Sequence, residues 1–438
     1  MKKLLIISPK WEKFRHWPFH MSLLGPLTVA GLTPDGWDIE YMDENAEPLR
    51  LDATPDIVAI SAMTAQAARG YEIADSFRAR NIPVVMGGIH ATLVPDEAVN
   101  HADSVVIGEA EGIWPTVLAD YTIGALQPRY QRATRPDLSC SAGAFARRDL
   151  LPKTGYTKIP GGNRAVDTIQ AGRGCGKNCE HCNVPAVLGV RFRPRPLNDV
   201  LAEIATTTSH FLFLTDDCLP TEPVHFANLF SALRGQNRRF LSVGALHLVN
   251  DLPYLKLLVD GGLRVLYLGF DRLDPTWRPV KARAAVDEPY HVDIKMHDVD
   301  FCRDFLNRPG IYLDAIKCIR DHGISIIATF AFGFDDDSPD IFERCIEFAV
   351  KSEVELADFA ALTPYPKSPL AVRLARESRI LTTNWRLYNG CHAVFRPKLM
   401  SPQQLEEGTL WAWDTFNREK PYFRRMIETF RAKDEPRG

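Results

Sequence analysis

Short apolar runs alternate with stretches typical of helices over the first 125 residues of the chain. The runs are rich in β-branched residues and continuously apolar, which is typical of strands buried on both faces of a parallel sheet. Polar or glycine residues follow each run. This alternation predicts a doubly wound α/β domain over residues 1–125, with its ligand site at the carboxyl ends of the strands. The predicted strands cover residues 3–8, 38–42, 56–61, 83–87 and 104–107.

Residues 126–165 break this pattern. They contain four prolines, the Gly161-Gly162 pair and charges of both signs. Such a composition is typical of irregular connections. It predicts a linker that leads into a second domain.

The alternation returns over residues 166–370, which predicts about six strand–helix units in one parallel sheet, either open or a partial barrel. Residues 276–300 interrupt the pattern and are expected to form an inserted loop or lid. Residues 371–438, rich in Arg and Trp, are expected to be mainly helical. The predicted strands of this part cover residues 165–170, 210–215, 240–246, 264–270, 324–333 and 357–364.

Charge and hydropathy exclude some classes of protein. Lys plus Arg number 52 and Asp plus Glu number 55, so the net charge is -3. This balance gives no support to a nucleic-acid partner. No apolar run approaches the ~20 residues that a membrane-spanning helix needs. The first residues, MKKLLIISPKW, are too short for a signal peptide and fit a strand better. We therefore expect a cytoplasmic protein without a membrane span.

Three of the nine cysteines fall within eight residues, in the segment GRGCGKNCEHC over 172–182. Cys175, Cys179 and Cys182 have the spacing Cys-x3-Cys-x2-Cys and follow a predicted strand directly. Three thiolates on one loop can hold three irons of a [4Fe–4S] cluster and leave the fourth iron open to a substrate or cofactor. A zinc knuckle with a distant fourth ligand and chance clustering are the alternatives. Zinc sites usually close with a fourth Cys or His, and His181 is poorly placed to serve beside Cys182.

This motif, at this position, resembles the signature of the radical S-adenosylmethionine (radical SAM) superfamily. The resemblance implies a partial (β/α)6 barrel in which Cys175, Cys179 and Cys182 ligate the cluster. SAM would chelate the open iron through its amino and carboxylate groups and yield methionine and a 5′-deoxyadenosyl radical. His181 takes the position that usually lies near the adenine.

The same resemblance implies further contacts with SAM. Asp216 and Asp217 follow the second strand of the barrel, where the family meets the SAM amino group; their alternative role is a helix N-cap. Arg193 can face an anion such as the SAM carboxylate, or can simply carry surface charge. Gly269 and Asp271 take the place of a ribose contact near the end of the fourth strand. Gly333 takes the place of a glycine turn near the adenine after the fifth.

The front domain resembles the cobalamin-binding module that precedes the barrel in one radical SAM subgroup. The matching segments follow the third, fourth and fifth strands, where small residues let a corrin ring approach the backbone. The alternative is a Rossmann-like domain whose glycines only form turns. The string Asp-x-His-x-x-Gly, which supplies an axial histidine in another cobalamin family, is absent. The resemblance therefore implies cobalamin without a histidine ligand in a Rossmann-like (flavodoxin-like) domain, near Ser61, Ala62, Thr64, Gly87, Gly88, His90, Gly108 and Glu109.

Together these resemblances imply a cobalamin-dependent radical SAM methyltransferase acting on an unactivated carbon of a small molecule. One SAM would methylate cobalamin to methylcobalamin, and a second would give the radical that removes a substrate hydrogen. The family analogy allows lipids, tetrapyrroles and antibiotic precursors as substrates, and an electron donor such as flavodoxin or ferredoxin. One alternative is a non-methylating enzyme of the same architecture, such as an oxidative cyclase or one that rearranges a ring. Another is a cobalamin or redox sensor.

Overall fold

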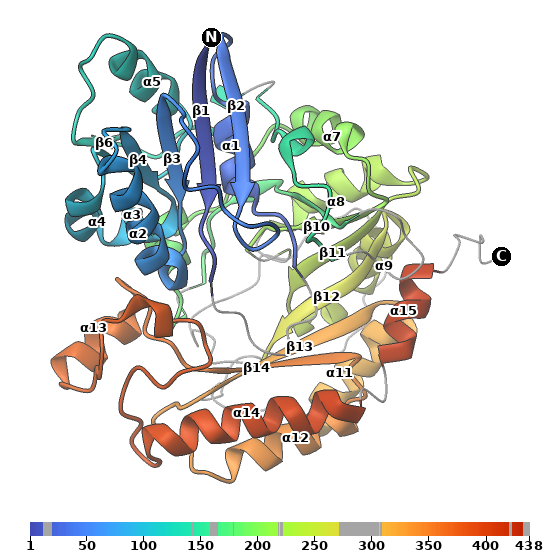
Figure 1. The fold of residues 1–438 in the computed structure, drawn as a ribbon. Coiled ribbons are helices and arrows are strands. Elements are labelled where there is room, and N and C mark those ends of the chain that lie inside the picture. Colours follow the sequence, from blue (N-terminus) through green and yellow to red (C-terminus); the bar gives the residue numbers. More distant parts are fainter. Residues whose placement is uncertain are drawn as a thin grey trace.

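The computed structural model describes residues 1–11, 20–141, 144–157, 165–177, 179–217, 219, 222–270, 306, 309–419 and 423–431. Two six-stranded sheets dominate the described chain (Figure 1). The expected insertion at 276–300 and the expected ribose contact Asp271 lie outside the described residues.

The first sheet has the strand order β2-β1-β3-β4-β5-β6, and every pair is parallel. Leu5 and Ile7 of β1 face one hydrophobic core, and Leu4 and Ile6 face another. Helices therefore cover both faces of the sheet, as a doubly wound fold requires. The strands are β1 (Lys2–Ser8), β2 (Trp37–Asp43), β3 (Ile57–Ser61), β4 (Val84–Gly87), β5 (Ser104–Ile107) and β6 (Arg129–Gln131), and the helices are α1 (Leu24–Gly31), α2 (Ala67–Arg78), α3 (Gly88–Leu93), α4 (Pro95–His101) and α5 (Trp114–Thr122).

The strand β6 lies in the segment expected as a linker. It pairs with β5 in parallel, so the first sheet continues past residue 125. Its three residues include the exposed Arg129 and Gln131. A strand this short and polar has no hydrophobic periodicity, which is why the sequence pattern did not predict it.

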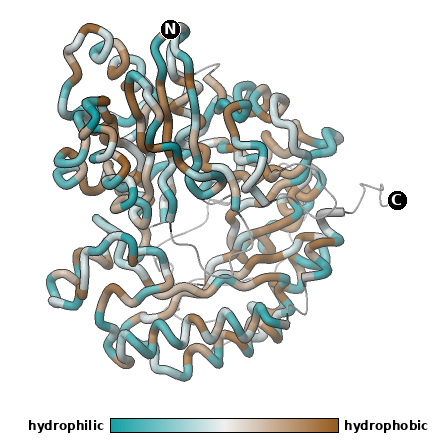
Figure 2. The backbone as a smooth tube through the Cα atoms, in the orientation of Figure 1, coloured by the Kyte–Doolittle hydropathy of each residue, from teal (hydrophilic) through white to brown (hydrophobic). Residues whose placement is uncertain are grey.

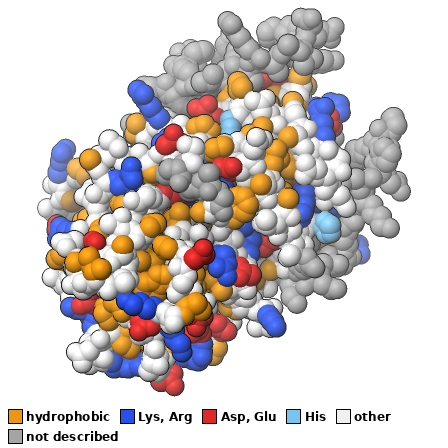
Figure 3. Space-filling view, turned by 90° about the horizontal axis from the view of Figure 1, so that it is seen from above, with side chains coloured by type: hydrophobic (Ala, Val, Ile, Leu, Met, Phe, Trp, Pro, Cys, Tyr) orange, Lys and Arg blue, Asp and Glu red, His pale blue; other side chains and the backbone are white. Residues whose placement is uncertain are grey.

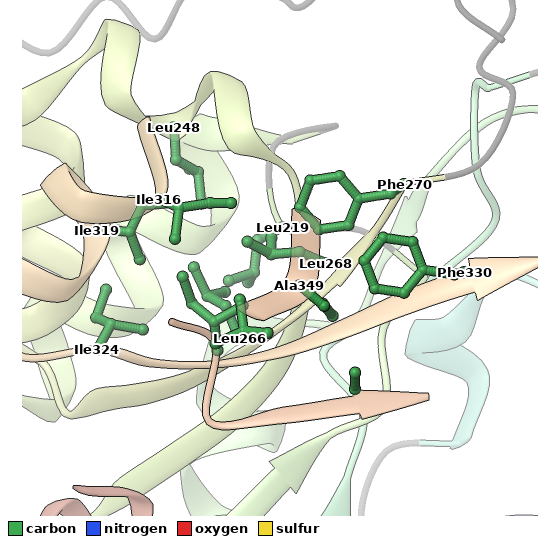
Figure 4. Close-up of a cluster of buried hydrophobic side chains, with 14 of the residues drawn as sticks. Leu219, Leu248, Leu266, Leu268, Phe270, Ile316, Ile319, Ile324, Phe330 and Ala349 are labelled. Carbon is green, nitrogen blue, oxygen red and sulfur yellow. The ribbon is translucent and has the colours of Figure 1, made fainter. Parts of the chain in front are cut away.

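The second sheet runs in chain order, β7-β10-β11-β12-β13-β14, and every pair is parallel; within the described chain β7 and β14 are its edge strands. Its outer face packs on helices in a core that includes Phe270 and Phe330, whose rings stack with centroids 5.2 Å apart (Figure 4). The strands are β7 (Asp167–Ile169), β10 (Phe211–Leu214), β11 (Arg239–Gly244), β12 (Leu263–Gly269), β13 (Ser325–Phe332) and β14 (Leu356–Ala361), and the helices are α7 (Leu197–Thr206), α8 (Pro223–Leu233), α9 (Leu252–Asp260), α11 (Pro309–Asp321) and α12 (Ile341–Lys351).

The helix α15 (Phe423–Arg431) closes one end of the second sheet. Its buried Met426 packs in a cluster with Phe211, Leu241 and Ile327, which lie near the starts of their strands on the inner face. The amino-terminal end of the partial barrel is therefore filled. Ligands are expected at the carboxyl ends of the strands, as in complete barrels.

The C-terminal region also contains α13 (Pro369–Arg376), the short helix η6 (Trp385–Leu387) and α14 (Pro402–Glu419). Between α13 and α14, Ile380 and Phe395 form an isolated antiparallel bridge. Trp413 of α14 donates a hydrogen bond to the carbonyl of Phe359 in β14.

Hydropathy follows this architecture. The buried strands are the most hydrophobic segments along the backbone (Figure 2). Basic and acidic side chains are interspersed over the face seen in Figure 3, as the near-balanced composition predicts. Within the described chain, no helix combines the length and hydropathy that crossing a membrane requires.

Candidate cluster and cofactor site

A two-stranded antiparallel pair closes the base of the cysteine loop. The pair joins β8 (Gly172–Arg173) and β9 (Arg193–Pro194), with α6 (Val184–Leu188) between them. Within the loop, the amide of Cys175 donates to the carbonyl of Gly189 at 3.2 Å. The amide of Cys182 donates to the carbonyl of Cys179 at 3.1 Å. The sequence pattern did not predict this pair, because two-residue strands are too short for a periodic pattern.

Gly174 is required by the geometry of this loop. Its φ is +101°, and a Cβ there would lie 2.2 Å from the carbonyl oxygen of Arg191. A side chain would therefore clash with backbone and also strain the left-handed conformation. The glycine lets the chain turn tightly just before Cys175.

The three cysteine thiols lie on one short loop and differ in exposure. Cys175 is buried, and Cys179 and Cys182 are partly exposed. Among the residues that the structure describes, no three His, Cys, Asp or Glu side chains converge on the position of one ion. In a [4Fe–4S] cluster each thiolate ligates its own iron, so such convergence is not needed. Three thiols on one loop are the donor set of a [4Fe–4S] cluster with one open iron, so these cysteines fit that group.

Asp216 and Asp217 hold the backbone of the cysteine loop. One oxygen of Asp216 accepts a hydrogen bond from the amide of Ala171 at 2.8 Å, and one oxygen of Asp217 accepts from Gly174 at 3.3 Å. Burial raises the pKa of Asp216 to about 7 and that of Asp217 to about 6. The second oxygen of Asp216 is buried and has no hydrogen-bond partner. The resemblance implies a SAM contact for both carboxylates, with a helix N-cap as the alternative; neither interpretation includes these bonds to the backbone of the loop.

His181 lies beside the turn that follows β13. Its ring meets that of Phe334 edge-on, with centroids 6.2 Å apart, and its Nδ1 is buried without a hydrogen-bond partner. Gly333, with φ +104°, donates its amide hydrogen to Asp337 at 2.9 Å. The two positions expected near the adenine are therefore adjacent in space. Gly269 is exposed at the end of β12.

The turns after β3, β4 and β5 lie against one another at the carboxyl edge of the first sheet. A Cβ on Gly88, whose φ is +89°, would lie 2.9 Å from the backbone of Ala62. The Thr92 hydroxyl donates to the carbonyl of Gly88 at 2.8 Å and accepts from the amide of Gly108 at 2.9 Å. A Cβ on Gly108, whose φ is +93°, would meet nothing within 4 Å. The backbone is thus bare and open at Gly108, as close approach by a flat ring requires.

Thr64 and His90, both expected near cobalamin, differ in their hydrogen bonding. The hydroxyl of Thr64, just after β3, is buried without a hydrogen-bond partner, as a group awaiting a ligand would be. His90 instead packs between Tyr71 and Trp385: its Nε2 lies 3.0 Å from the Tyr71 hydroxyl, and its ring centroid lies 5.1 Å from that of Trp385. Burial lowers the pKa of His90 to about 4, so this imidazole is neutral. Ser61 and Gly87 end β3 and β4, beside Ala62 and Gly88.

A buried charge network joins this edge to the cysteine loop. Arg173 bonds Glu109 at 2.8 Å and Glu111 at 2.7 Å, and Arg193 bonds Glu109 at 2.5 Å. Burial acts to lower the pKa of Arg173, but the charges of Glu111 and Glu109 outweigh it and raise that pKa. The turn after β5 therefore meets the loop after β7. Arg193 and Glu109 face each other here, whereas the sequence had assigned them separately to SAM and cobalamin.

Sequence reasoning missed two polar residues inside the partial barrel. The Tyr267 hydroxyl in β12 donates to Asp358 in β14 at 2.7 Å. Tyr267 packs against the cluster on the inner face of the sheet. A polar side chain at an inward position of an otherwise apolar strand is the signal that could have found them.

The matched family model and the curated relatives agree with this arrangement. The model described as "B12 binding domain" matches residues 18–118. A bacteriochlorophyllide d C-8(2)-methyltransferase of Chlorobaculum tepidum is 27% identical over 88% of this chain and 82% of its own. A hopanoid C-2 methylase of Rhodopseudomonas palustris is 22% identical over 87% and 71%. An anaerobic magnesium-protoporphyrin IX monomethyl ester cyclase of Cereibacter sphaeroides is 22% identical over 92% and 67%.

Solved structures share the fold. The radical SAM methyltransferase TsrM of Kitasatospora setae, solved with cobalamin and a [4Fe-4S] cluster, aligns with a TM-score of 0.60 and 16% identity, over 86% of this chain and 75% of its own. The cobalamin-dependent SAM radical enzyme OxsB aligns with a TM-score of 0.64 and 12% identity, over 98% and 71%. The expected fold class and the expected resemblance to cobalamin-binding radical SAM enzymes are confirmed.

Proposed function

We propose that this chain is a cobalamin-dependent radical SAM methyltransferase that methylates an unactivated carbon of a small molecule. The observation that carries the proposal is the contact between the turn after β5 and the cysteine loop through Glu109 and Arg173. This contact brings the carboxyl edge of the first sheet, the proposed cobalamin site, together with the cysteine loop, the proposed cluster site, so that both cofactors can serve one reaction.

The residues of the chain divide between three tasks. Cys175, Cys179 and Cys182 hold the cluster, and His181, Gly333 and Gly269 lie beside SAM. When bound, cluster and SAM supply a radical that removes a hydrogen atom, and cobalamin supplies the methyl group. Asp216 and Asp217 keep the cysteine loop in shape through the amides of Ala171 and Gly174. The proposed contacts to cobalamin are Ser61, Ala62, Thr64, Gly87, Gly88 and Gly108.

The proposed substrate class is a cyclic tetrapyrrole. Support comes from the names of the relatives, which include a bacteriochlorophyllide methyltransferase and a magnesium-protoporphyrin ester cyclase. Tyr267 and Asp358, inside the partial barrel, would orient the substrate. The proposal also includes a cytoplasmic location and a one-electron donor such as flavodoxin or ferredoxin.

Oxidative cyclisation is the second candidate, and it is favoured by the likeness to the cyclase. That relative is less similar than the methyltransferase, 22% identical against 27%. The mass of the product separates the two reactions: methylation adds CH2, whereas oxidative cyclisation removes hydrogen.

The first experiment is anaerobic purification with cobalamin supplied, followed by analysis of iron, sulfide and cobalt and by EPR of cob(II)alamin. We expect about four irons and one cobalt per chain. Tetrapyrrole acceptors are then assayed for S-adenosylhomocysteine, 5′-deoxyadenosine and a product heavier by CH2. The variant Cys179→Ala should lose all three. Four irons without cobalt, or SAM cleavage that never gives S-adenosylhomocysteine, would overturn the proposal.

A further inference from the structure

Two arginines stand directly opposite each other at the base of the cysteine loop. Arg173 of β8 and Arg193 of β9 are partners in the antiparallel pair that closes this loop. Like charges opposite each other on paired strands are destabilising. Both side chains are largely buried, with exposed fractions of 14% and 21%, so water screens their repulsion only weakly. By itself the pair would tend to open.

The front domain supplies the compensating charge. Glu109 places one carboxylate oxygen 2.8 Å from Nη1 of Arg173 and the other 2.5 Å from Nη2 of Arg193. Glu111 binds the remaining Nη2 of Arg173 at 2.7 Å. The side chains of Glu109 and Glu111 are only 5% and 4% exposed. Glu109 is thus the one described carboxylate that bonds both arginines.

A third arginine adds positive charge next to Glu109. Nη1 of Arg135 lies 3.7 Å from the same oxygen of Glu109 that Arg193 binds. The side chain of Arg135 also donates to the carbonyl groups of Val187 and Ala186, in α6 of the cysteine loop. Without the Glu109 charge, the pair of Arg173 with Glu111 is the one described ion pair that this group of three arginines would keep.

We propose that Glu109 is a positioning residue that keeps the cysteine loop in its cluster-holding shape, so that the front domain and the cluster loop are energetically coupled. This inference rests on the proposed function, because it takes the loop to hold a cluster and the turn after β5 to meet cobalamin. Glu109 is the chain neighbour of Gly108, where the backbone is open, so a ligand that rests on Gly108 would lie next to Glu109. Coupling between two binding sites is reciprocal, so each cofactor should tighten the binding of the other.

The test begins with Glu109→Gln, which keeps the size of the side chain and removes its charge. We expect iron to leave the anaerobically loaded variant about tenfold faster than the wild type in the presence of a chelator, the size of effect seen for groups that orient metal ligands. Hydrogen exchange of the amides of residues 174–182 should also quicken, while that of β10 to β12 should not change.

The matched control is Glu97→Gln. Glu97 is also a front-domain glutamate that bonds another part of the chain, since it accepts from Nε1 of Trp385 at 2.7 Å, but it does not touch the cysteine loop. Iron loss and loop exchange should stay at the wild-type values. Equal effects of the two substitutions would mean that any loosening of the front domain releases iron, and the inference would fail.

The decisive variant is Glu109→Gln/Arg193→Gln, which removes one of the opposed arginines as well. If repulsion between Arg173 and Arg193 opens the loop, the double variant should hold iron about as well as the wild type. If Glu109 matters only as a hydrogen-bonding partner, the second substitution will make iron loss faster still. That result, or wild-type iron retention in Glu109→Gln, overturns the inference.

A final measurement addresses the coupling. Hydroxocobalamin is titrated into the wild type with and without its reconstituted cluster, and we expect the cluster to lower the Kd about fivefold or more. This difference should vanish in Glu109→Gln. If the wild type binds no cobalamin, the proposed function fails, whereas iron loss and amide exchange still decide the role of Glu109. If cobalamin binds equally with and without the cluster, the coupling is wrong and the proposed function stands.

Discussion

The carboxylate of Glu180 lies 2.5 Å from Nε of Arg373, a residue 193 positions later in the chain. Glu180 sits between Cys179 and His181 in the cysteine loop, and its carbonyl also accepts the amide of Leu370 in α13 at 2.8 Å. Arg373 bonds Asp335 as well, at 2.8 Å, in the turn after β13. The helix α13 therefore holds the cysteine loop from a side different from that of the β8–β9 pair.

Replacing Arg373 should loosen this contact. Arg373 and Glu180 are about one third exposed, so the ion pair is partly screened, and Arg373→Gln should cost about 1 kcal/mol of unfolding free energy. Urea unfolding of the apoprotein measures this loss, and iron content should fall with it. The control Arg344→Gln removes a more exposed pair, between Arg344 of α12 and Asp340 just before that helix, and should cost less than about 0.5 kcal/mol. Equal costs would show that Arg373 acts only as surface charge.

Two glycines of the cysteine loop should respond in opposite ways to substitution by alanine. A Cβ on Gly174 would lie 2.2 Å from a backbone oxygen, whereas a Cβ on Gly176 would meet the carbonyl of Val190 at an ordinary 3.7 Å. Gly174→Ala should therefore lose most of its iron, and Gly176→Ala should keep it. Iron and sulfide analysis after anaerobic reconstitution measures both. A Gly174→Ala protein that binds a full cluster would show that this turn is not needed in the observed shape.

These relationships mark the limit of what the sequence could predict. The strands were predicted because a buried parallel strand must be continuously apolar, and the cysteines because their ligand spacing is local. The bond between Arg173 and Glu109 joins residues 64 positions apart, and the sequence around a charged residue does not indicate which distant residue it will pair with. Asp216 was noticed at its strand end, yet its bond to Ala171 depends on how β7 and β10 pair. The contacts between predicted elements are therefore what the structure adds.

His90 should make the protein sensitive to acid. Burial lowers the pKa of His90 from 6.5 to about 4. Between these pH values His90 is therefore protonated in the unfolded chain and neutral in the folded chain. The stability contributed by this neutral imidazole is present above pH 6.5 and is lost as the pH falls towards 4. Between pH 7.5 and 5 the loss should be about 2 kcal/mol. Denaturant unfolding at the two pH values should show that His90→Gln loses less stability than the wild type.

The control for this prediction is His101→Gln. His101 belongs to the same domain, but its side chain is one third exposed beside Asp75. This variant should keep the acid sensitivity of the wild type. If His90→Gln and the wild type lose equal stability between pH 7.5 and 5, the acid response comes from other groups.

Two threonines at the carboxyl edge of the first sheet, where cobalamin is proposed to bind, should change the stability of the apoprotein in opposite directions when replaced by valine. Thr64 has a buried hydroxyl without a partner, so Thr64→Val should stabilise the apoprotein by about 1 kcal/mol. It should also weaken cobalamin binding about fivefold if the ligand takes up that hydroxyl. Thr92 bonds Gly88 and Gly108, so Thr92→Val should destabilise the apoprotein by about the same amount. Thermal unfolding of the apoproteins and titration with hydroxocobalamin separate the two effects, and unchanged affinity in Thr64→Val would remove Thr64 from the site.

Gly108 offers the most direct test of where cobalamin lies. Gly108 and Gly124 both have positive φ, and a Cβ on either would meet no protein atom within 4 Å. Alanine at either position should therefore cost a similar amount, about 1 kcal/mol of backbone strain. Only Gly108 lies at the carboxyl edge of the first sheet, whereas Gly124 follows α5.

Absorbance titration should show cobalamin binding weakened about tenfold in Gly108→Ala, since a methyl group there would keep the ring from close contact with the backbone. In Gly124→Ala the Kd should match that of the wild type. Equal affinities in the two variants would mean that the ring rests elsewhere, and the assignment of the turn after β5 to cobalamin would then be wrong.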